Sequence, residues 1–211
     1  MCETADIAVI GLTGQSGAGK TTVCRVFEEK GFAIINADKI ARQIIEKGMP
    51  CLDELAECFG SEILYEDGTL NRQKLADIVF NDKERLKQLN AISYPYITSE
   101  ILNKIKKLSE ENCKFVLLDA PTLFESRADD FCNLIISVTA TEKNRTARVA
   151  QRDGITPEQI KQRFSSQHTE RFFINHSDFI IKNNKSIDEL IEKAKEVAEK
   201  IKEYYNAEET R

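Results

Sequence analysis

The chain has 211 residues, of which 41% are hydrophobic and 31% are charged, and it carries a formal net charge of −5 with a pI near 5.3. This hydrophobic content is enough to form the core of one globular domain with insertions. The acidic balance argues against broad nucleic-acid binding, which requires a basic face, and no stretch approaches the roughly 18 uncharged apolar residues that cross a membrane. We therefore expect neither nucleic acid nor a membrane as a partner.

The N-terminus and the cysteines indicate a cytoplasmic protein. Residues 1–6 are acidic and lead directly into an apolar stretch, so we expect no signal peptide. The cysteines lie far apart, without a CxxC pair or a histidine at metal-ligand spacing, which favours reduced thiols over a disulfide framework or a zinc site. They are Cys2, Cys24, Cys51, Cys58, Cys113 and Cys132.

The first expected strand, residues 7–12, is followed by the most informative segment. Residues 14–21 fill every position of the pattern G-x-x-x-x-G-K-[ST], and an expected helix over 22–30 comes next. Glycines let backbone amides wrap a phosphate, Lys20 supplies a charge, Thr21 offers a hydroxyl to Mg²⁺, and the helix directs its positive end at the anion. The alternative is a glycine-rich turn that merely ends a buried strand. We expect a nucleoside triphosphate to contact Gly14, Gly17, Ala18, Gly19, Lys20, Thr21 and Thr22.

A second strand is expected over residues 32–35, and Asp38 follows it closely. The carboxyl ends of parallel strands share one edge of a sheet, so Asp38 would lie at the edge that also carries the phosphate loop. Its carboxylate could there reach a metal shell and an incoming hydroxyl. It is equally possible that Asp38 simply caps the helix that begins at Lys39. The residues leave this choice open.

About eighty residues separate the second strand from the third, which is too long for a single crossover helix. We interpret residues 39–112 as a helical insertion that could build the pocket for a second substrate. Its expected helices cover 39–47, 52–59, 72–80, 83–92 and 96–108, separated by Gly48-Met49-Pro50, Glu66-Asp67-Gly68 and Pro95.

The third strand, residues 115–118, ends in Asp119. An apolar strand that ends in an acid is the usual way in which a phosphate-loop protein supplies a carboxylate facing Mg²⁺. Pro121 then forces a turn that would present Glu125 to the cleft, although Glu125 could equally be a surface acid.

Three arginines lie on one stripe of the helix after the fourth strand. Arg145, Arg148 and Arg152 are three and four residues apart, so they project from similar faces. Three cations on one stripe repel each other unless anions or acids face them. We favour contact with phosphate, and the alternative is ion pairs with Glu142 and Asp153.

Residues 153–175, the lid segment, are rich in Arg, Gln and Ser, and we interpret them as a mobile lid. A solvated helix pair is the alternative. His168 and His176 lack a serine or cysteine partner in a recognisable catalytic frame, so we treat them as surface or satisfied residues. A fifth strand is expected over 179–181, and the stretch from Ser186 begins like a capping box and continues as an amphipathic covering helix.

Five apolar segments, the fourth being residues 134–138, thus alternate with helical patterns. This alternation is typical of a mainly parallel sheet with helices on both faces. We predict an α/β fold of the P-loop NTPase type, a three-layer sandwich with a five-stranded sheet. The nucleotide-binding core would comprise residues 1–38 and 113–211, with the helical acceptor-binding insertion over 39–112.

The remaining pattern favours one class of P-loop protein. A GTPase would need a guanine-reading N-K-x-D after the fourth strand, which the sequence lacks, and a ring-forming or DNA-translocating ATPase would be longer. A small-metabolite kinase remains, and the chain resembles the dephospho-CoA kinase family over nearly its whole length. The matching residues are Gly11-Leu12-Thr13-Gly14, the loop from Gly17 to Thr22, Ala37-Asp38, Ile40-Ala41-Arg42, Phe59-Gly60, Asp67-Gly68-Thr69-Leu70-Asn71-Arg72, Leu75, Val79-Phe80, Pro95, Pro121, Leu123-Phe124-Glu125, Arg148, Arg152, Gln167, Asp178 and Asn183.

The chain departs from the family pattern at several positions. Members usually have Gly-Ile in place of Gln15-Ser16, Asp in place of Asn36, His in place of Tyr94, Leu in place of Thr122 and Gly in place of Asn184. The last change is tolerated because Asn adopts left-handed backbone geometry more easily than most residues.

The resemblance implies transfer of the γ-phosphoryl group of ATP to the ribose 3′-hydroxyl of dephospho-CoA, which gives CoA and ADP and completes CoA synthesis. Lys20 and the loop amides would hold the β- and γ-phosphates, Thr21 would act through Mg²⁺, and Asp119 would contribute through water. Asp38 would orient and deprotonate the ribose hydroxyl. ATP and Mg²⁺ are the expected cofactors.

The resemblance also assigns the remaining site residues. Arg148, with Arg152, would close over the transferring group, and Asn183 would lie near the adenine. The acceptor would contact Asp38, Arg42, Arg72, Tyr94, Pro121 and Glu125. We expect a monomer or a weak homo-oligomer whose partners are the small molecules ATP and dephospho-CoA.

Two other functions stay open. A nucleoside kinase or another small-metabolite kinase would also suit Gln15-Ser16 in the loop. A nucleotide-binding module without turnover is a different class, and the retention of Asp38 and of the arginine stripe argues against it.

Overall fold

A computed structural model of the chain describes residues 7–80 and 82–208. Residues 1–6, on which the expectation about a signal peptide rests, lie outside the described residues, and so does Cys2. Residues up to Ile35 and from Lys107 onward form one unit, the core unit, and Asn36–Lys106 form a second, the insertion unit. The predicted boundaries assign Asp38 to the core, whereas the structure places it near the start of the insertion unit.

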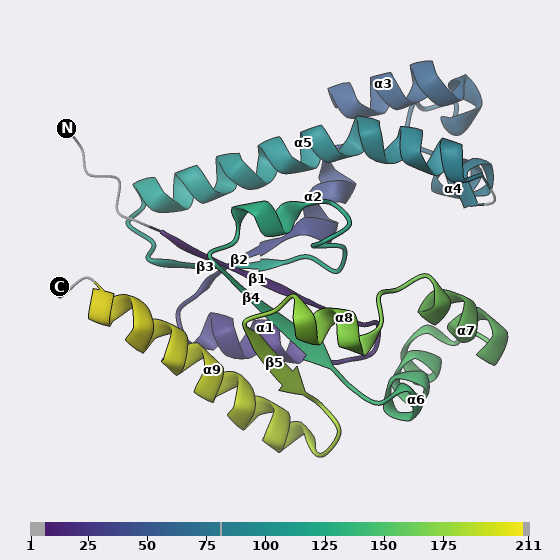
Figure 1. The fold of residues 1–211 in the computed structure, drawn as a ribbon. Coiled ribbons are helices and arrows are strands. Elements are labelled where there is room, and N and C mark those ends of the chain that lie inside the picture. Colours follow the sequence, from purple (N-terminus) through teal and green to yellow (C-terminus); the bar gives the residue numbers. More distant parts are fainter. Residues whose placement is uncertain (1–6, 81, 209–211) are drawn as a thin grey trace. The chain divides into compact units, whose positions relative to one another are not determined.

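The core unit is built on a five-stranded sheet with the strand order β2-β3-β1-β4-β5 (Figure 1). Strand β1 (Ala8–Gly14) is central and pairs in parallel with β3 (Phe115–Asp119) and β4 (Leu134–Thr139). Strand β5 (Phe179–Lys182) pairs in parallel with β4, and β2 (Ala33–Asn36) neighbours β3. The five predicted strands and the α/β class are confirmed.

Helices α1 (Lys20–Glu29) and α9 (Ile187–Glu208) pack against each other beside the sheet (Figure 1). Their buried side chains join those of β1 in the main core cluster, and Ala194 and Ala198 are fully buried because small side chains allow close approach. The Ser186 Oγ accepts a hydrogen bond from the Glu189 amide at 3.2 Å. The predicted cap and the predicted covering helix are therefore confirmed.

The other elements of the core unit follow β3 and β4. They are η2 (Ala128–Phe131), α6 (Glu142–Asp153), α7 (Pro157–Ser165) and α8 (Glu170–Asn175). A threonine caps each of the last three helices, because the side chains of Thr141, Thr156 and Thr169 each accept a backbone N–H. The lid segment therefore consists of the end of α6 and two short capped helices.

The insertion unit is helical, as predicted. Its elements are α2 (Ala37–Gln43), α3 (Pro50–Phe59), η1 (Ser61–Ile63), α4 (Arg72–Phe80) and α5 (Lys83–Glu110), the last of which continues past Lys106. The helix predicted over 39–47 ends at Gln43, where the chain enters turns before Pro50. None of the helices in the described part of the chain is long and apolar enough to cross a membrane.

The prediction of two helices separated by Pro95 is wrong. Helix α5 runs through Pro95 without interruption over 28 residues. An internal proline removes one backbone hydrogen bond and costs about 3 kcal/mol. A helix of this length keeps many other backbone hydrogen bonds, and it buries Ile101 beyond the proline. The local penalty is thus outweighed by the rest of the helix.

Candidate active site

The phosphate loop joins β1 to α1, and its glycines adopt backbone conformations that other residues avoid. The φ angle is +137° at Gly14, +77° at Gly17 and +109° at Gly19. A Cβ atom would approach the Val138 carbonyl oxygen to 2.2 Å at Gly14, and the Arg145 carbonyl oxygen to 2.8 Å at Gly17. Strand β4 and helix α6 therefore pack so closely on the loop that only glycine fits.

Lys20 and the start of α1 form the positively charged part of this loop. The Lys20 Nζ donates a hydrogen bond to the Gly14 carbonyl oxygen at 3.1 Å, so the side chain folds back over the loop. Gly19, which has no side chain, occupies the N-cap position of this ten-residue helix. Loop amides, a helix N-terminus and an ammonium group together can bind a phosphate group.

Asp119 lies at the end of β3, in register with Leu12 of β1. It is half-buried and interacts with the thiol of Cys24 on α1. Burial, followed by the charge and the hydrogen bond of Asp119, raises the pKa of Cys24 to about 12, while the charge of Lys20 lowers it. Asp119 and Lys20 thus both act on the same thiol, which brings the predicted metal-facing carboxylate close to the phosphate loop.

Arg148 and Asn183 lie together against the loop. The Arg148 guanidinium donates to the Gly17 carbonyl oxygen at 3.3 Å and to the backbone and side-chain oxygens of Asn183, each at 3.2 Å. Asn183 is buried, and its Nδ2 donates to the Ala18 carbonyl oxygen at 2.8 Å. These hydrogen bonds join Arg148 and Asn183 to the phosphate loop. Both residues are predicted to contact ATP, and they lie 35 positions apart in the sequence.

Arg152 forms the ion pair with Asp153 that is the alternative interpretation of the arginine stripe. Its guanidinium forms an ion pair with Asp153 at 2.6 Å, and Arg163 of α7 pairs with the same carboxylate. The hydrogen bonds from Arg152 and Arg163 hold the pKa of Asp153 well below its usual range. These contacts connect the end of α6 with α7 inside the lid segment.

The lid segment also contacts the phosphate loop directly. The backbone N–H of Ser16 donates to Gln167 Oε1 at 3.1 Å, and Gln15 Nε2 donates to the His168 carbonyl oxygen at 3.2 Å. These contacts could not be predicted from local sequence patterns, because about 150 residues separate the partners. The signal that could have found them is the departure from the family pattern at Gln15-Ser16.

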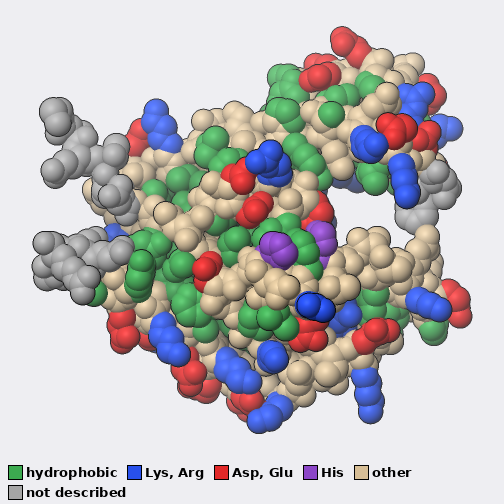
Figure 2. Space-filling view, in the orientation of Figure 1, with side chains coloured by type: hydrophobic (Ala, Val, Ile, Leu, Met, Phe, Trp, Pro, Cys, Tyr) green, Lys and Arg blue, Asp and Glu red, His purple; other side chains and the backbone are tan. Residues whose placement is uncertain are grey.

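Pro121 and Glu125 lie beyond the end of β3. The Pro121 carbonyl oxygen accepts from Thr13 Oγ1 at 3.3 Å, and Glu125 is exposed, with an oxygen 3.6 Å from His168 Nε2. His168 stacks on Phe172 with ring centroids 3.7 Å apart. Figure 2 shows the histidines at the surface beside hydrophobic side chains. As predicted, His168 is a surface residue satisfied by packing.

Four predicted acceptor contacts belong to the insertion unit. Asp38 is exposed in the first turn of α2, and the residue that caps this helix is Asn36, whose side chain accepts the Lys39 N–H at 2.8 Å. The interpretation of Asp38 as the helix cap is therefore wrong, because Asn36 has extended backbone geometry and already fills that position. The other three are Arg42, exposed in the last turn of α2, Arg72, exposed at the start of α4, and Tyr94, half-buried in α5.

Known proteins resemble this chain over most of its length. A sequence model described as "Dephospho-CoA kinase" matches residues 8–189. A dephospho-CoA kinase of Listeria innocua is 38% identical over 179 residues, which cover 85% of this chain and 90% of that relative. One from Oryza sativa subsp. japonica is 34% identical, covering 92% of this chain and 85% of the relative.

Solved structures agree with this assignment. TT1252 from Thermus thermophilus superposes with a TM-score of 0.80 at 28% identity, covering 92% of this chain and 98% of that one. A dephospho-CoA kinase from Campylobacter jejuni gives a TM-score of 0.69 at 29% identity, covering 92% and 96%. A shikimate kinase from Acinetobacter baumannii, at 16% identity and a TM-score of 0.51, shares the fold alone. Because the family model and the relatives cover nearly the whole chain, the protein belongs to the dephospho-CoA kinase family.

Proposed function

We propose that this protein transfers the γ-phosphoryl group of ATP to the ribose 3′-hydroxyl of dephospho-CoA, giving CoA and ADP. The observation that carries the proposal is a phosphate loop in which only glycine fits at key positions, in a chain that matches the family over residues 8–189. A second candidate, another small-metabolite kinase, rests on the departure from the family pattern at Gln15-Ser16, since these residues would also suit the loop of a nucleoside kinase.

The nucleotide binds to the phosphate loop in this proposal. The amides of Gly17, Ala18 and Gly19 and the Lys20 ammonium hold the β- and γ-phosphates. Arg148 and Asn183, which are joined at the loop, contact the nucleotide from the side of α6 and β5. Further nucleotide contacts are assigned to Gly14, Thr21 and Thr22.

Thr21 and Asp119 supply the ligands for Mg²⁺. A hydroxyl and a carboxylate are oxygen donors of the kind that Mg²⁺ prefers. Thr21 follows Lys20 in the sequence, and the charges of Asp119 and Lys20 both act on the Cys24 thiol. When bound, Mg²⁺ neutralises the charge of the phosphates.

The acceptor binds to residues 39–112, together with Pro121 and Glu125. Asp38 accepts the proton of the ribose hydroxyl. The hydroxyl oxygen then forms a bond to the γ-phosphorus, while the bond from that phosphorus to the bridging β-phosphate oxygen breaks and ADP leaves. Arg42, Arg72 and Tyr94 contact the acceptor. The exposure of Asp38, Arg42 and Arg72 supports these assignments, since each side chain is accessible to a ligand. The lid segment closes over the bound substrates, and the enzyme acts in the cytoplasm as a monomer or weak homo-oligomer.

The test is a substrate panel with a matched variant. The protein is incubated with ATP, Mg²⁺ and either dephospho-CoA, uridine or shikimate, and ADP formation is measured beside Lys20→Ala. We expect turnover with dephospho-CoA alone, and none in Lys20→Ala, whose circular dichroism should stay unchanged. Turnover with uridine or shikimate but not with dephospho-CoA would replace the proposal by the second candidate. Full activity in Lys20→Ala would remove the phosphate loop from the mechanism.

A further inference from the structure

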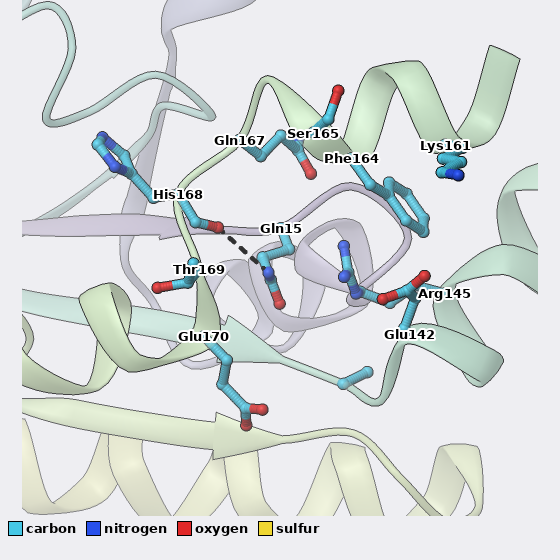
Figure 3. Close-up of a pocket in the computed structure, with 11 residues that line it drawn as sticks. Gln15, Glu142, Arg145, Lys161, Phe164, Ser165, Gln167, His168, Thr169 and Glu170 are labelled. Carbon is cyan, nitrogen blue, oxygen red and sulfur yellow. Dashed lines mark hydrogen bonds between the residues drawn. The ribbon is translucent and has the colours of Figure 1, made fainter. Parts of the chain in front are cut away.

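A cleft lies beside the contacts that join the phosphate loop to the lid segment, and Gln15, Gln167 and His168 line it. It has a volume of about 430 Å³ and lies in the core unit, between the loop, the start of α6 and the lid segment (Figure 3). We call it the Arg145 cleft. Its lining residues are Gln15, Ala140, Glu142, Arg145, Lys161, Phe164, Ser165, Gln167, His168, Thr169 and Glu170.

Arg145 is an unsatisfied cation in this cleft. Its side chain is only 6% exposed, and its Nε and Nη1 atoms are buried without a hydrogen-bond partner among the described residues. The guanidinium carbon lies 4.1 Å from the centroid of the Phe164 ring, a contact that satisfies neither nitrogen. An arginine stays charged in proteins, so burial without hydrogen bonds is costly. This residue needs an acceptor that the described protein does not supply.

Gln15, next to Arg145, lacks a hydrogen-bond donor rather than an acceptor within the described part of the chain. Its side chain is 7% exposed, and its Nε2 is engaged with the His168 carbonyl oxygen, which leaves the Oε1 buried without a partner. In Figure 3 the Arg145 guanidinium points toward the Gln15 amide beneath the Phe164 ring. An occupant of the cleft must therefore accept hydrogen bonds from Arg145 and donate one to Gln15.

The surrounding charges favour an occupant with a single negative charge. Glu142 and Lys161 are exposed at the rim, and Glu170 is half-buried, so the two acids oppose a strongly anionic ligand. The buried Arg145 is screened less than these rim charges and attracts an anion that reaches it. A carboxylate carries one charge at neutral pH, whereas a phosphate monoester carries about −1.5 to −2.

We propose that the Arg145 cleft binds a small hydroxy-monocarboxylate. Its carboxylate accepts hydrogen bonds from the Nε and Nη1 of Arg145, and its hydroxyl donates to the Oε1 of Gln15. The Phe164 ring covers the carbon skeleton. The proposal rests on the unpaired atoms of Arg145 and Gln15, so it does not depend on the function proposed above.

The test is an NMR titration of the full-length protein labelled with ¹⁵N, with glycerate as the probe. We expect saturable shifts of the Gln15, Arg145 and Phe164 amides, with a Kd on the order of 1–10 mM, which is within reach of so small a ligand. Acetate, which lacks the hydroxyl, and inorganic phosphate, which carries more charge, should each bind at least several-fold more weakly. Equal binding of acetate or phosphate would overturn the assignment, and absence of shifts at the cleft would show that it holds only water.

Variants locate the binding. Arg145→Gln should lose glycerate binding at least tenfold, since it removes a charged hydrogen-bond donor. Arg171→Gln removes the same charge from an exposed position outside the cleft lining, and it should bind glycerate as the wild type does. Equal affinity of Arg145→Gln and wild type would refute the site. If Arg145→Gln does not fold, the wild-type shifts and the comparison of the three probes decide the matter.

Discussion

At the scale of single residues, the sequence offered Asp38 two roles, helix cap and catalytic base, and the structure gives the cap to Asn36. Asn36 caps α2 by accepting a hydrogen bond from the Lys39 amide, and Asp38 stays exposed in the first turn of the same helix. Asn caps a helix about as well as Asp, so the departure from the family residue at position 36 costs little stability. The carboxylate of Asp38 is thus free of the structural role that competed with catalysis.

Asp38→Asn should therefore separate chemistry from stability. The stability of the fold should fall by no more than about 1 kcal/mol, since only the favourable interaction of an acid with the helix N-terminus is lost. The single-turnover phosphorylation of dephospho-CoA should slow by about 10² to 10⁴, because an amide cannot accept the ribose proton. Thermal melting, ATP affinity and the single-turnover rate are measured on one preparation.

Asn36→Ala is the matched control for this variant. It should lose about 0.5–2 kcal/mol of stability through the missing cap. Its single-turnover rate at a temperature where it is folded should stay close to that of the wild type. A folded, ATP-binding Asp38→Asn protein with a near-normal rate would leave the proposed mechanism without its base.

Arg148 provides a second prediction at this scale. Its guanidinium joins Gly17 and Asn183, so Arg148→Ala should weaken ATP binding by about 10- to 100-fold through the loss of charged hydrogen bonds. If Arg148 also stabilises the transferring group, the single-turnover rate at saturating ATP should fall further, by about 10³ or more. Calorimetry and rapid quench separate the two effects. Unchanged ATP affinity and rate would make Arg148 a purely structural residue.

At the scale of elements, the lid segment and the phosphate loop are joined by side-chain contacts. Gln167, at the turn between α7 and α8, accepts the Ser16 N–H, and Gln15 reaches the backbone at His168. The loop that binds phosphate is thereby held by the segment that would close over it. We infer that displacement of the lid segment releases one backbone amide of the loop.

Gln167→Met should expose this coupling. Methionine has a similar length but lacks the oxygen that accepts the Ser16 N–H, so hydrogen exchange of the Ser16 amide should accelerate at least tenfold. The KM for ATP should rise in the same variant. Gln167→Glu retains an acceptor oxygen and should keep both properties close to those of the wild type. Similar exchange rates in all three proteins would show that the contact does not hold the loop.

At the scale of the whole molecule, the phosphate loop and most of the predicted acceptor contacts belong to different units. The core unit carries the phosphate loop, and the insertion unit carries Asp38 and three further predicted acceptor contacts. The two units are continuous in sequence at β2 and α2, where Asn36 ends the strand and caps the helix. The chain passes between the units a second time within α5, which runs across the boundary at Lys106.

Hydrogen exchange with each substrate tests this division. Dephospho-CoA should protect backbone amides within residues 39–112, since a bound ligand reduces local opening there. The ATP analogue AMP-PNP should protect the loop around Gly17 and Lys20 instead. Protection by dephospho-CoA that lies wholly outside residues 39–112 would place the acceptor elsewhere.

The sequence by itself determined the five strands, the phosphate loop, the insertion and the family. These features depend on local patterns: alternating apolar runs, glycines at fixed spacing, and an acid at the end of a strand. The phosphate loop around Lys20 and the strand that ends at Asp119 could therefore be predicted, because residues close together in the chain specify each of them.

Only the tertiary structure decided the remaining features. Pro95 is accommodated because the whole of α5 outweighs one lost hydrogen bond, and Arg152 is paired with Asp153 because the side chains of α6 and α7 meet. The burial of Arg145 beneath Phe164, and the contact of Gln167 with Ser16, join residues that no local pattern relates. Burial and pairing depend on which distant segments pack together, and that information is a property of the folded chain.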